Sequence, residues 1–302
     1  MGIMTVSGPV APEELGLTLT HEHIILDLRH HGYDGILDDV DLAIDELRPL
    51  EEAGCGAVVE LSNEFMGRDV KALKRVSEET GLHIIASTGY YTEPYYPPRV
   101  YEWSTERLAD LMVTELTEGI DGTGIRAGII GEIGTSRDFI SPAGERVFRS
   151  AARAHLRTGA AISTHTYLEQ LIFDQLEILE DEGVEPGRII IGHLGDLRDL
   201  DRLKAVAAKG VYLQIDHVGL EDRQLDLARA KTVGHLVRQG YVSQILLSMD
   251  VCFKSRLRRF GGTGYDHILR SFVPMLDAEG VTESEIRTVM FDNPQRVLAY
   301  DC

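Results

Sequence analysis

Histidines and carboxylates interrupt the apolar runs of this sequence at widely separated points. The segment "LTLTHEHIILDL" at residues 17–28 carries two of them, His21 and His23. Four more interrupt later runs: Glu132, His165, His193 and Asp250. A single buried histidine is more often a hydrogen-bonded core residue than a ligand. If all six meet in one place, however, burying them without a cation costs several kcal/mol in unpaired charge and unsatisfied donors. The set therefore predicts a site for divalent cations.

Four imidazoles and two carboxylates determine what such a site could do. These ligands suit zinc first, with manganese, cobalt, iron and nickel as alternatives. Six ligands, one of them a bridging carboxylate, suit two ions about 3.5–4 Å apart that share a hydroxide. The charge left after the ligands are counted can polarise a substrate oxygen and lower the pKa of a bound water toward about 7. The expected chemistry is metal-assisted hydrolysis.

Eight short aliphatic runs are the elements that must position these residues. They cover residues 17–24, 56–62, 83–90, 127–134, 161–166, 188–194, 211–218 and 244–250. Amphipathic segments such as "DVDLAIDELRPLEEAG" and "GERVFRSAARAHLRTG" separate them and end in glycine, a helix stop signal. Apolar strands that alternate with helices indicate a parallel sheet covered by helices, and eight such units predict a (β/α)8 TIM barrel. A doubly wound open sheet is the alternative, but no Gly-rich phosphate loop follows the first run.

A barrel would bring the polar residues together, because each of them falls at the carboxyl end of a predicted strand. Active sites of (β/α)8 barrels form at this rim. Side chains two residues apart on a strand point to the same side. We therefore expect His21 and His23 to face the barrel interior, with Glu22 pointing away, and the binuclear metal centre to lie at the C-terminal rim.

Composition limits the remaining possibilities. A chain of 302 residues with 43% hydrophobic residues suits one hydrolase domain over residues 1–302. Its net charge of −19 argues against nucleic-acid and anionic-membrane partners, and no apolar run approaches the roughly 18 residues of a membrane span. No signal-peptide pattern is seen, and three unpatterned cysteines indicate a cytoplasmic protein. We expect a small-molecule substrate, with an anionic one as an option, and a homodimer is compatible with the sequence.

Several motifs resemble a known family. T-H-E-H, G-E-I-G-T-S, S-T-H-T, I-G-H and S-M-D, in this order, are similar to the phosphotriesterase family of the amidohydrolase superfamily. The resemblance extends from Leu17 to "FDNPQRVL" near the C-terminus. The stretches "STGYY" and "GGTGYD" are most similar to the glutamate-bridged phosphotriesterase homology proteins.

The resemblance implies a role for each candidate ligand. His21 and His23 would bind the buried metal, and His165 and His193 the exposed one. Glu132 would bridge the two, and Asp250 would ligate the buried ion and accept the proton. The best-known phosphotriesterases bridge with a carbamylated lysine, so Glu132 indicates the branch in which phosphotriesterase activity is often weak or absent.

Other residues are candidates for substrate binding. Tyr90 and Tyr91 would line the substrate pocket, although their loop could equally be a rigid segment packed on the rim. Lys254 or Arg256, soon after Asp250, would bind a carboxylate or phosphate of the substrate, unless they only form a solvated helix face. Asp216 could hydrogen bond a ligand histidine, and we interpret His217 as a rim residue.

The leading hypothesis is a binuclear metal-dependent hydrolase that acts on a small carboxylic ester, lactone or amide through a metal-bridging hydroxide. One alternative is a phosphotriester or phosphodiester hydrolase with the same site. The other is a non-catalytic small-molecule binding protein, against which the six intact ligand positions argue. A Schiff-base aldolase would need a lysine at an inner strand end, and no predicted strand ends in one.

Overall fold

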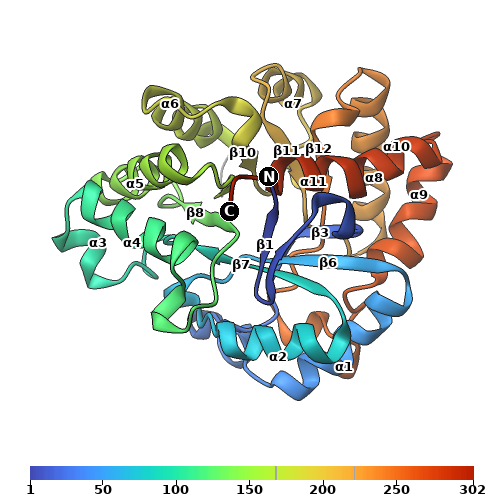
Figure 1. Cartoon of the computed structure of the whole chain (residues 1–302). Coiled ribbons are helices and arrows are strands. Elements are labelled where there is room, and N and C mark those ends of the chain that lie inside the picture. Colours follow the sequence, from blue (N-terminus) through green and yellow to red (C-terminus); the bar gives the residue numbers. More distant parts are fainter. Residues whose placement is uncertain (167–168, 221) are drawn as a thin grey trace.

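The computed structural model describes residues 1–166, 169–220 and 222–302. Within them, eight parallel strands form a nearly closed barrel in which each strand pairs with its neighbours in chain order (Figure 1). The strands are β3 (Leu17–Glu22), β6 (Cys55–Glu60), β7 (His83–Thr88), β8 (Ile129–Gly134), β9 (Ile162–His165), β10 (Ile189–Ile191), β11 (Tyr212–Ile215) and β12 (Ile245–Leu247). The predicted (β/α)8 TIM barrel is confirmed.

The first and last strands of the barrel are joined by hydrogen bonds that involve the residues after β12. The backbone amide of His21 donates to Ser248 Oγ at 2.9 Å, and the amide of Asp250 donates to the carbonyl of His21 at 3.1 Å. The first and last of the six candidate ligands, His21 and Asp250, therefore meet where β3 and β12 adjoin.

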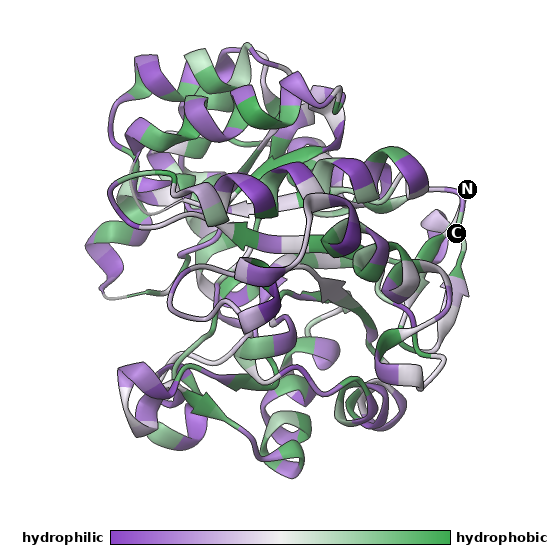
Figure 2. Cartoon of the chain, turned by 90° about the vertical axis from the view of Figure 1, so that its left-hand side faces the viewer, coloured by the Kyte–Doolittle hydropathy of each residue, from purple (hydrophilic) through white to green (hydrophobic). Residues whose placement is uncertain are grey.

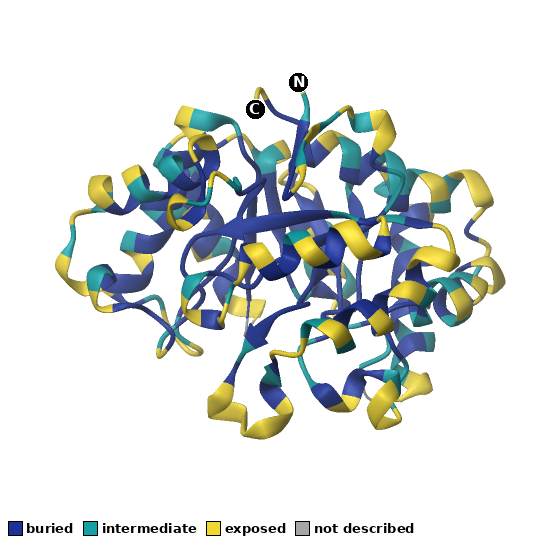
Figure 3. Ribbon diagram, turned by 60° about the horizontal axis from the view of Figure 1, so that its bottom comes forward, coloured by how far each residue is buried: buried dark blue, intermediate teal, exposed yellow. Residues whose placement is uncertain are grey.

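Helices surround the barrel. They are α1 (Val40–Glu52), α2 (Val70–Thr80), α3 (Pro98–Glu102), α4 (Thr105–Thr117), α5 (Pro142–Thr158), α6 (Ile172–Asp181), α7 (Leu200–Ala207), α8 (Arg223–Arg238), α9 (Val273–Ala278), α10 (Glu283–Arg287) and α11 (Asn293–Leu298). The start and end of α5 illustrate how the sequence sets these bounds. Ser141 accepts a hydrogen bond from the amide of Gly144, and Gly159 ends the helix with a φ of 83°. The helices are banded in hydropathy (Figure 2), and their outward faces are exposed (Figure 3).

Two apolar layers hold the sheet between them. Along β6, Ala57 and Val59 belong to a cluster that also takes residues from β7, β8, β10, β11 and β12, together with Ala161 just before β9, which places this cluster inside the barrel. Val58, between them, belongs to the larger cluster shared with the helices. This alternation is the period of two expected for a strand that is buried on both faces.

The two ends of the barrel are closed differently. At the amino end of the strands, the hairpin of β1 (Ile3–Thr5) and β2 (Gly8–Val10) contributes Ile3 to the inner cluster, and α11 contributes Val297. The opposite end is formed by the loops that follow the strands. No helix among the described residues is long and apolar enough to cross a membrane.

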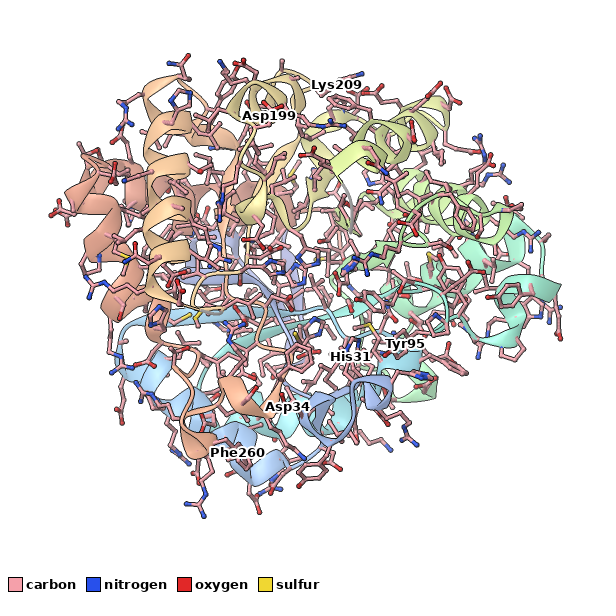
Figure 4. The ribbon with its side chains drawn as sticks, turned by 180° about the vertical axis from the view of Figure 1, so that it is seen from behind. His31, Asp34, Tyr95, Asp199, Lys209 and Phe260 are labelled. Carbon is pink, nitrogen blue, oxygen red and sulfur yellow. The ribbon has the colours of Figure 1, made fainter. Side chains whose placement is uncertain are left out.

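At the carboxyl end of the strands, a second hairpin extends over neighbouring loops. It consists of β4 (Leu26–Asp27) and β5 (Ile36–Leu37), and its tip carries Asp34, whose carboxylate accepts hydrogen bonds from Ser255 N and Oγ at 2.7 and 2.8 Å. The ring of His30 lies 5.2 Å from that of Tyr95. Figure 4 views this side, with Asp34 and Tyr95 labelled. The hairpin therefore links the loops that follow β7 and β12.

Candidate metal centre

The six predicted ligands lie together at the carboxyl end of the strands, with Glu132 shared between two groups of histidines. Glu132 Oε2 lies 2.8 Å from His165 Nδ1 and 3.4 Å from His193 Nε2. On the other side, Glu132 Oε2 lies 3.5 Å from His21 Nε2, and Oε1 lies 3.6 Å from His23 Nε2. Each histidine pair together with Glu132 has the compactness of a metal site. A carboxylate in this position can serve both pairs.

Asp250 completes the group around His21 and His23. Its Oδ1 atom lies 3.3 Å from His23 Nε2 and 3.9 Å from His21 Nε2. The side chains of the six residues are no more than 12% exposed. The sequence therefore correctly predicted which side chains would meet.

Glu132 reaches the centre because β8 departs from regular geometry. The register of β8 against β9 shifts between Ile130 and Ile133, and Gly131 has a φ of 138°. A Cβ atom at Gly131 would lie 2.4 Å from the carbonyl oxygen of Ser163, so this position requires glycine. The peptide bond between Gly131 and Glu132 is cis.

A second irregularity positions the two histidines of β3. Leu19 belongs to the outer apolar layer, and the register of β3 against β6 shifts between Leu19 and Glu22. Beyond the shift, His21 and His23 both face Glu132, as predicted. Without the shift, regular alternation from Leu19 would place His21 on the outer side of the sheet.

Glu22 points away from the histidines and holds the loop that carries Asp250. Its carboxylate accepts hydrogen bonds from Ser248 Oγ and Met249 N at 2.7 Å and from Val251 N at 3.0 Å. Burial raises the pKa of Glu22 to about 7, although these hydrogen bonds oppose the rise. The residue between the two histidines thus fixes the backbone of Asp250, another candidate ligand.

Asp216 orients two of the histidines. Its Oδ1 atom lies 3.1 Å from His193 Nδ1, and its Oδ2 atom lies 3.1 Å from His21 Nδ1. A carboxylate at Nδ1 favours the tautomer protonated there, which leaves the lone pair of Nε2 directed at Glu132. The predicted hydrogen bond between Asp216 and a candidate ligand histidine is confirmed.

The electrostatics of the cluster fit a divalent cation. Burial raises the pKa of Glu132, but the charges of His165 and His21 outweigh it and hold that pKa well below the usual range. Burial lowers the pKa of His23, but the carboxylates of Asp250 and Glu132 outweigh burial and raise that pKa to about 10. His21 Nε2 is buried and has no hydrogen-bond partner among the described residues. Buried carboxylates together with an unpartnered imidazole nitrogen are the donor set that divalent transition metals require.

The role of Asp216 leads to a first prediction. Asp216→Asn should weaken zinc binding by about 10-fold to 100-fold, because the amide holds the histidine tautomers less firmly than a carboxylate. Competition with a chromophoric chelator measures this affinity. Asp201→Asn, at a position where the carboxylate is 90% exposed on α7, is the matched control and should bind zinc as the wild type does. Unchanged affinity in Asp216→Asn would contradict the orienting role.

His217 has contacts that the sequence did not reveal. Its Nε2 atom lies 3.3 Å from Asp250 Oδ2, and its Nδ1 atom lies 2.5 Å from Asp196 Oδ2. Its ring stacks on that of His193 at 4.6 Å. Burial lowers its pKa, but Asp196 and Asp250 outweigh burial and raise it to about 9. The only sequence signal was the pair "DH" near the end of the seventh run, because the partner of His217, Asp196, follows a different strand.

Of the two candidate tyrosines after β7, Tyr91 lies beside the centre. Tyr91 places its hydroxyl 3.4 Å from His165 Nε2, with the two rings 4.7 Å apart. Tyr90 is buried, which raises the pKa of its hydroxyl, and that hydroxyl has no hydrogen-bond partner among the described residues. Substrate contact by either tyrosine stays a prediction.

The two candidate cations contact groups of the chain itself. Lys254 Nζ lies 3.5 Å from the centre of the Tyr33 ring and 3.9 Å from Asp38 Oδ1. Arg256 Nη2 donates to the carbonyls of Val218 and Met249 at 3.0 and 3.1 Å. Arg256 therefore braces the backbone next to Asp250. A substrate anion at Lys254 or Arg256 stays a prediction.

Two cavities lie among the loops at this end of the barrel, and one of them adjoins the centre. One of about 220 Å³ is lined by residues that include Thr166, His193 and Asp196. The other, of about 410 Å³, is lined by residues that include His30 and Tyr95. Both are large enough for a group of a few heavy atoms, and the first reaches the candidate ligands directly.

Comparisons with known proteins agree with this geometry. The model of the phosphotriesterase family matches residues 1–298. The chain is 38% identical to the phosphotriesterase homology protein of Escherichia coli, over 93% of this chain and 97% of that one. It is 32% identical to the N-acetyltaurine hydrolase of Tetraodon nigroviridis, over 99% of this chain and 98% of that one. A crystal structure of a lactonase from Listeria monocytogenes superimposes with a TM-score of 0.93 at 27% identity and covers all of both chains.

A solved structure of the Escherichia coli protein, with phosphate in its active site, superimposes with a TM-score of 0.91 at 37% identity. It covers 95% of this chain and 99% of that one. Relatives named as hydrolases, together with the buried histidine and carboxylate cluster, make this chain a metal-dependent hydrolase. From the family match over nearly its whole length, the chain belongs to the phosphotriesterase family.

Proposed function

We propose that the protein is a binuclear metal-dependent hydrolase that acts on a small carboxylic ester, lactone or amide. The observation that carries the proposal is the position of Glu132, whose carboxylate is shared by the two histidine pairs. Relatives named as an N-acetyltaurine hydrolase and a lactonase support a carbonyl substrate. We propose one hydrolase domain over residues 1–302. A homodimer and a cytoplasmic location stay predictions.

The residues divide into two ligand groups joined by one carboxylate. His21, His23 and Asp250 would hold one ion and His165 and His193 the other, with Glu132 as ligand to both. When bound, such a pair of divalent cations activates water and polarises the substrate oxygen. Zinc is the metal that we propose first, since nitrogen and oxygen ligands of this kind suit it.

Asp250 is placed to accept the proton that the attacking water releases. Its Oδ1 atom faces the histidines, and its Oδ2 atom faces His217 Nε2 at 3.3 Å. On the far side of His217, Nδ1 contacts Asp196, whose side chain is 43% exposed and lines the 220 Å³ cavity. A proton taken up at Asp250 can therefore pass through His217 to Asp196 and leave to solvent.

Phosphotriester or phosphodiester hydrolysis is a second candidate for the same site. The observation that favours it is the phosphate in the active site of the related Escherichia coli structure. A phosphoryl oxygen and a carbonyl oxygen make similar demands on a pair of cations, so substrate turnover has to separate the two.

A substrate panel tests the proposal. The zinc-loaded protein is assayed against γ- and δ-lactones, aryl acetates, N-acetyltaurine with other N-acyl amino acids and amino sulfonates, and aryl phosphotriesters and phosphodiesters. We expect turnover within the carbonyl group. Turnover of phosphoesters alone would replace the first candidate with the second, and no turnover by protein with a full complement of metal would overturn both.

The ligand set also predicts a metal content. Protein expressed with added zinc or manganese should contain close to two divalent metals per chain, because two histidine groups share one carboxylate. Elemental analysis after gel filtration measures the ratio. One metal per chain at saturation, or full activity in metal-free protein, would contradict a binuclear centre.

A further inference from the structure

Arg229, on α8, is the largest fully buried side chain among the described residues, and it contacts Asp196 at the end of the proton path described above. Its Nε and Nη2 atoms donate to Asp196 Oδ1 at 3.2 and 2.6 Å. Its Nη1 atom donates to Asp226 Oδ1 at 3.0 Å and to the carbonyl of Leu220 at 3.2 Å. One guanidinium thus connects α8 with the loops after β10 and β11.

The contact with Asp196 divides the two oxygens of that carboxylate. Oδ1 accepts from Arg229, while Oδ2 faces His217 Nδ1. A carboxylate held in this way cannot rotate its oxygens without losing bonds to a buried charge. Burial raises the pKa of Asp196, but His217 and Arg229 outweigh it and lower the pKa to about 2, so the carboxylate is present as an acceptor.

Through its contact with Leu220, Arg229 also holds the backbone of His217, which is the hydrogen-bond partner of Asp196. The amide of Leu220 donates to the carbonyl of His217 at 3.0 Å, so the carbonyl that Arg229 binds belongs to the turn that begins at His217. Arg229 therefore fixes both Asp196 and the backbone that carries His217. A lysine offers one compact ammonium and cannot make these contacts together.

The charge of Arg229 is also balanced from the far side. Asp226 pairs with Arg229 through Oδ1 and with His267 Nε2 through Oδ2 at 2.9 Å, and it accepts from the amide of Gly219 at 2.9 Å. These bonds hold the guanidinium in place, which is what a group needs if it is to orient another side chain.

We propose that Arg229 is a positioning residue for hydrolysis: it holds Asp196 and the His217 turn so that His217 Nε2 stays directed at Asp250 Oδ2. The proposal rests on the proposed function. It differs from a general stabilising role, because it predicts that Arg229 acts through Asp196.

Kinetics of zinc-loaded variants with 4-nitrophenyl acetate as the probe test this dependence. Arg229→Met should lower kcat by about 10-fold to 100-fold with KM within about twofold, as expected for a lost outer contact that does not bind substrate. Asp196→Asn should have a similar effect, and the double variant should lose no more than the larger single loss. Arg229→Lys should retain part of kcat. A double variant in which the two losses multiply would overturn the proposal.

Arg68 supplies the matched control. It is another buried guanidinium, paired with Glu115 through two hydrogen bonds of 2.8 Å, and it contacts none of the residues in the proton path. Arg68→Met should lower Tm as Arg229→Met does and leave kcat within about twofold, since a buried carboxylate loses its partner in both variants. Equal losses of kcat in the two variants would show that Arg229 has only a structural role.

Nuclear magnetic resonance of protein with ¹⁵N-labelled histidine gives a readout that needs no turnover. In the wild type, the Nδ1 proton of His217 should give a downfield signal, assigned by its loss in His217→Gln, because it is shared with Asp196. The signal should disappear or shift in Arg229→Met and persist in Arg68→Met. If no panel substrate is hydrolysed, the proposed function fails while this measurement still decides the positioning. An unchanged signal in Arg229→Met would overturn it.

Discussion

Asp250→Asn is expected to keep the barrel intact and to lower kcat by about 10²-fold to 10⁴-fold, the contribution of a positioned general base. Asparagine has the shape of aspartate, so the backbone hydrogen bonds around residue 250 can persist, including the one that the amide of residue 250 donates to the carbonyl of His21. Its amide nitrogen, however, cannot accept a proton and pass it to His217, which lies 3.3 Å from Asp250 Oδ2.

The measurement is kcat of the metal-loaded variant on the best panel substrate, together with metal content and Tm. Asp201→Asn on α7 is again the control, because its carboxylate is 90% exposed and pairs with Lys204, which is not one of the candidate ligands. Activity of Asp250→Asn within a few-fold of the wild type, at full metal content, would show that another group accepts the proton.

Glu132→Gln is expected to lose both metals together. One amide oxygen cannot neutralise two cations as a carboxylate does, and the two histidine groups depend on the same side chain. Activity should fall to the level of the metal-free protein. Glu115→Gln removes another buried carboxylate, one that is paired with Arg68 away from the centre, and should retain both metals.

The same residue predicts how the centre assembles. A glutamate carries its charge from synthesis, whereas a carbamylated lysine forms only with carbon dioxide. Reconstitution of the metal-free protein should therefore be independent of added bicarbonate, as measured by metal content and activity. A bicarbonate requirement in the wild type, or two metals and full activity in Glu132→Gln, would show that Glu132 is not the bridge.

The sequence predicted the barrel and the meeting of the candidate ligands because both depend on simple periodicities. Eight aliphatic runs with polar ends leave few alternatives once the strands are parallel, since all their carboxyl ends then lie at one rim. His21, Glu132 and Asp250 therefore converge in the structure although more than a hundred residues separate each from the next.

What the sequence could not provide is the local backbone that aims these side chains. The strands are shorter than the apolar runs: β10 ends at Ile191 and β12 at Leu247, so His193 and Asp250 lie beyond them, with φ of 61° and 49°. The register shifts in β3 and β8 are equally invisible in a pattern of residue types.

The sequence also could not predict contacts between loops that follow different strands. Asp196 and His217 follow different strands, and no spacing rule connects them. The same holds for Arg256, whose guanidinium is directed at backbone carbonyls next to Asp250, although its place in a cationic segment indicated a surface or a substrate contact.

The meeting of β3 with β12 has a consequence for the order of events during folding. The ligands extend from residue 21 to residue 250, so the entropy of closing almost the whole chain has to be overcome before they can meet. A zinc finger, by contrast, gathers its ligands from a short segment and folds as it binds. Because His21 and Asp250 meet only where β3 and β12 adjoin, the complete metal centre should form after barrel closure, and a metal-sensitive dye would report this last step of refolding.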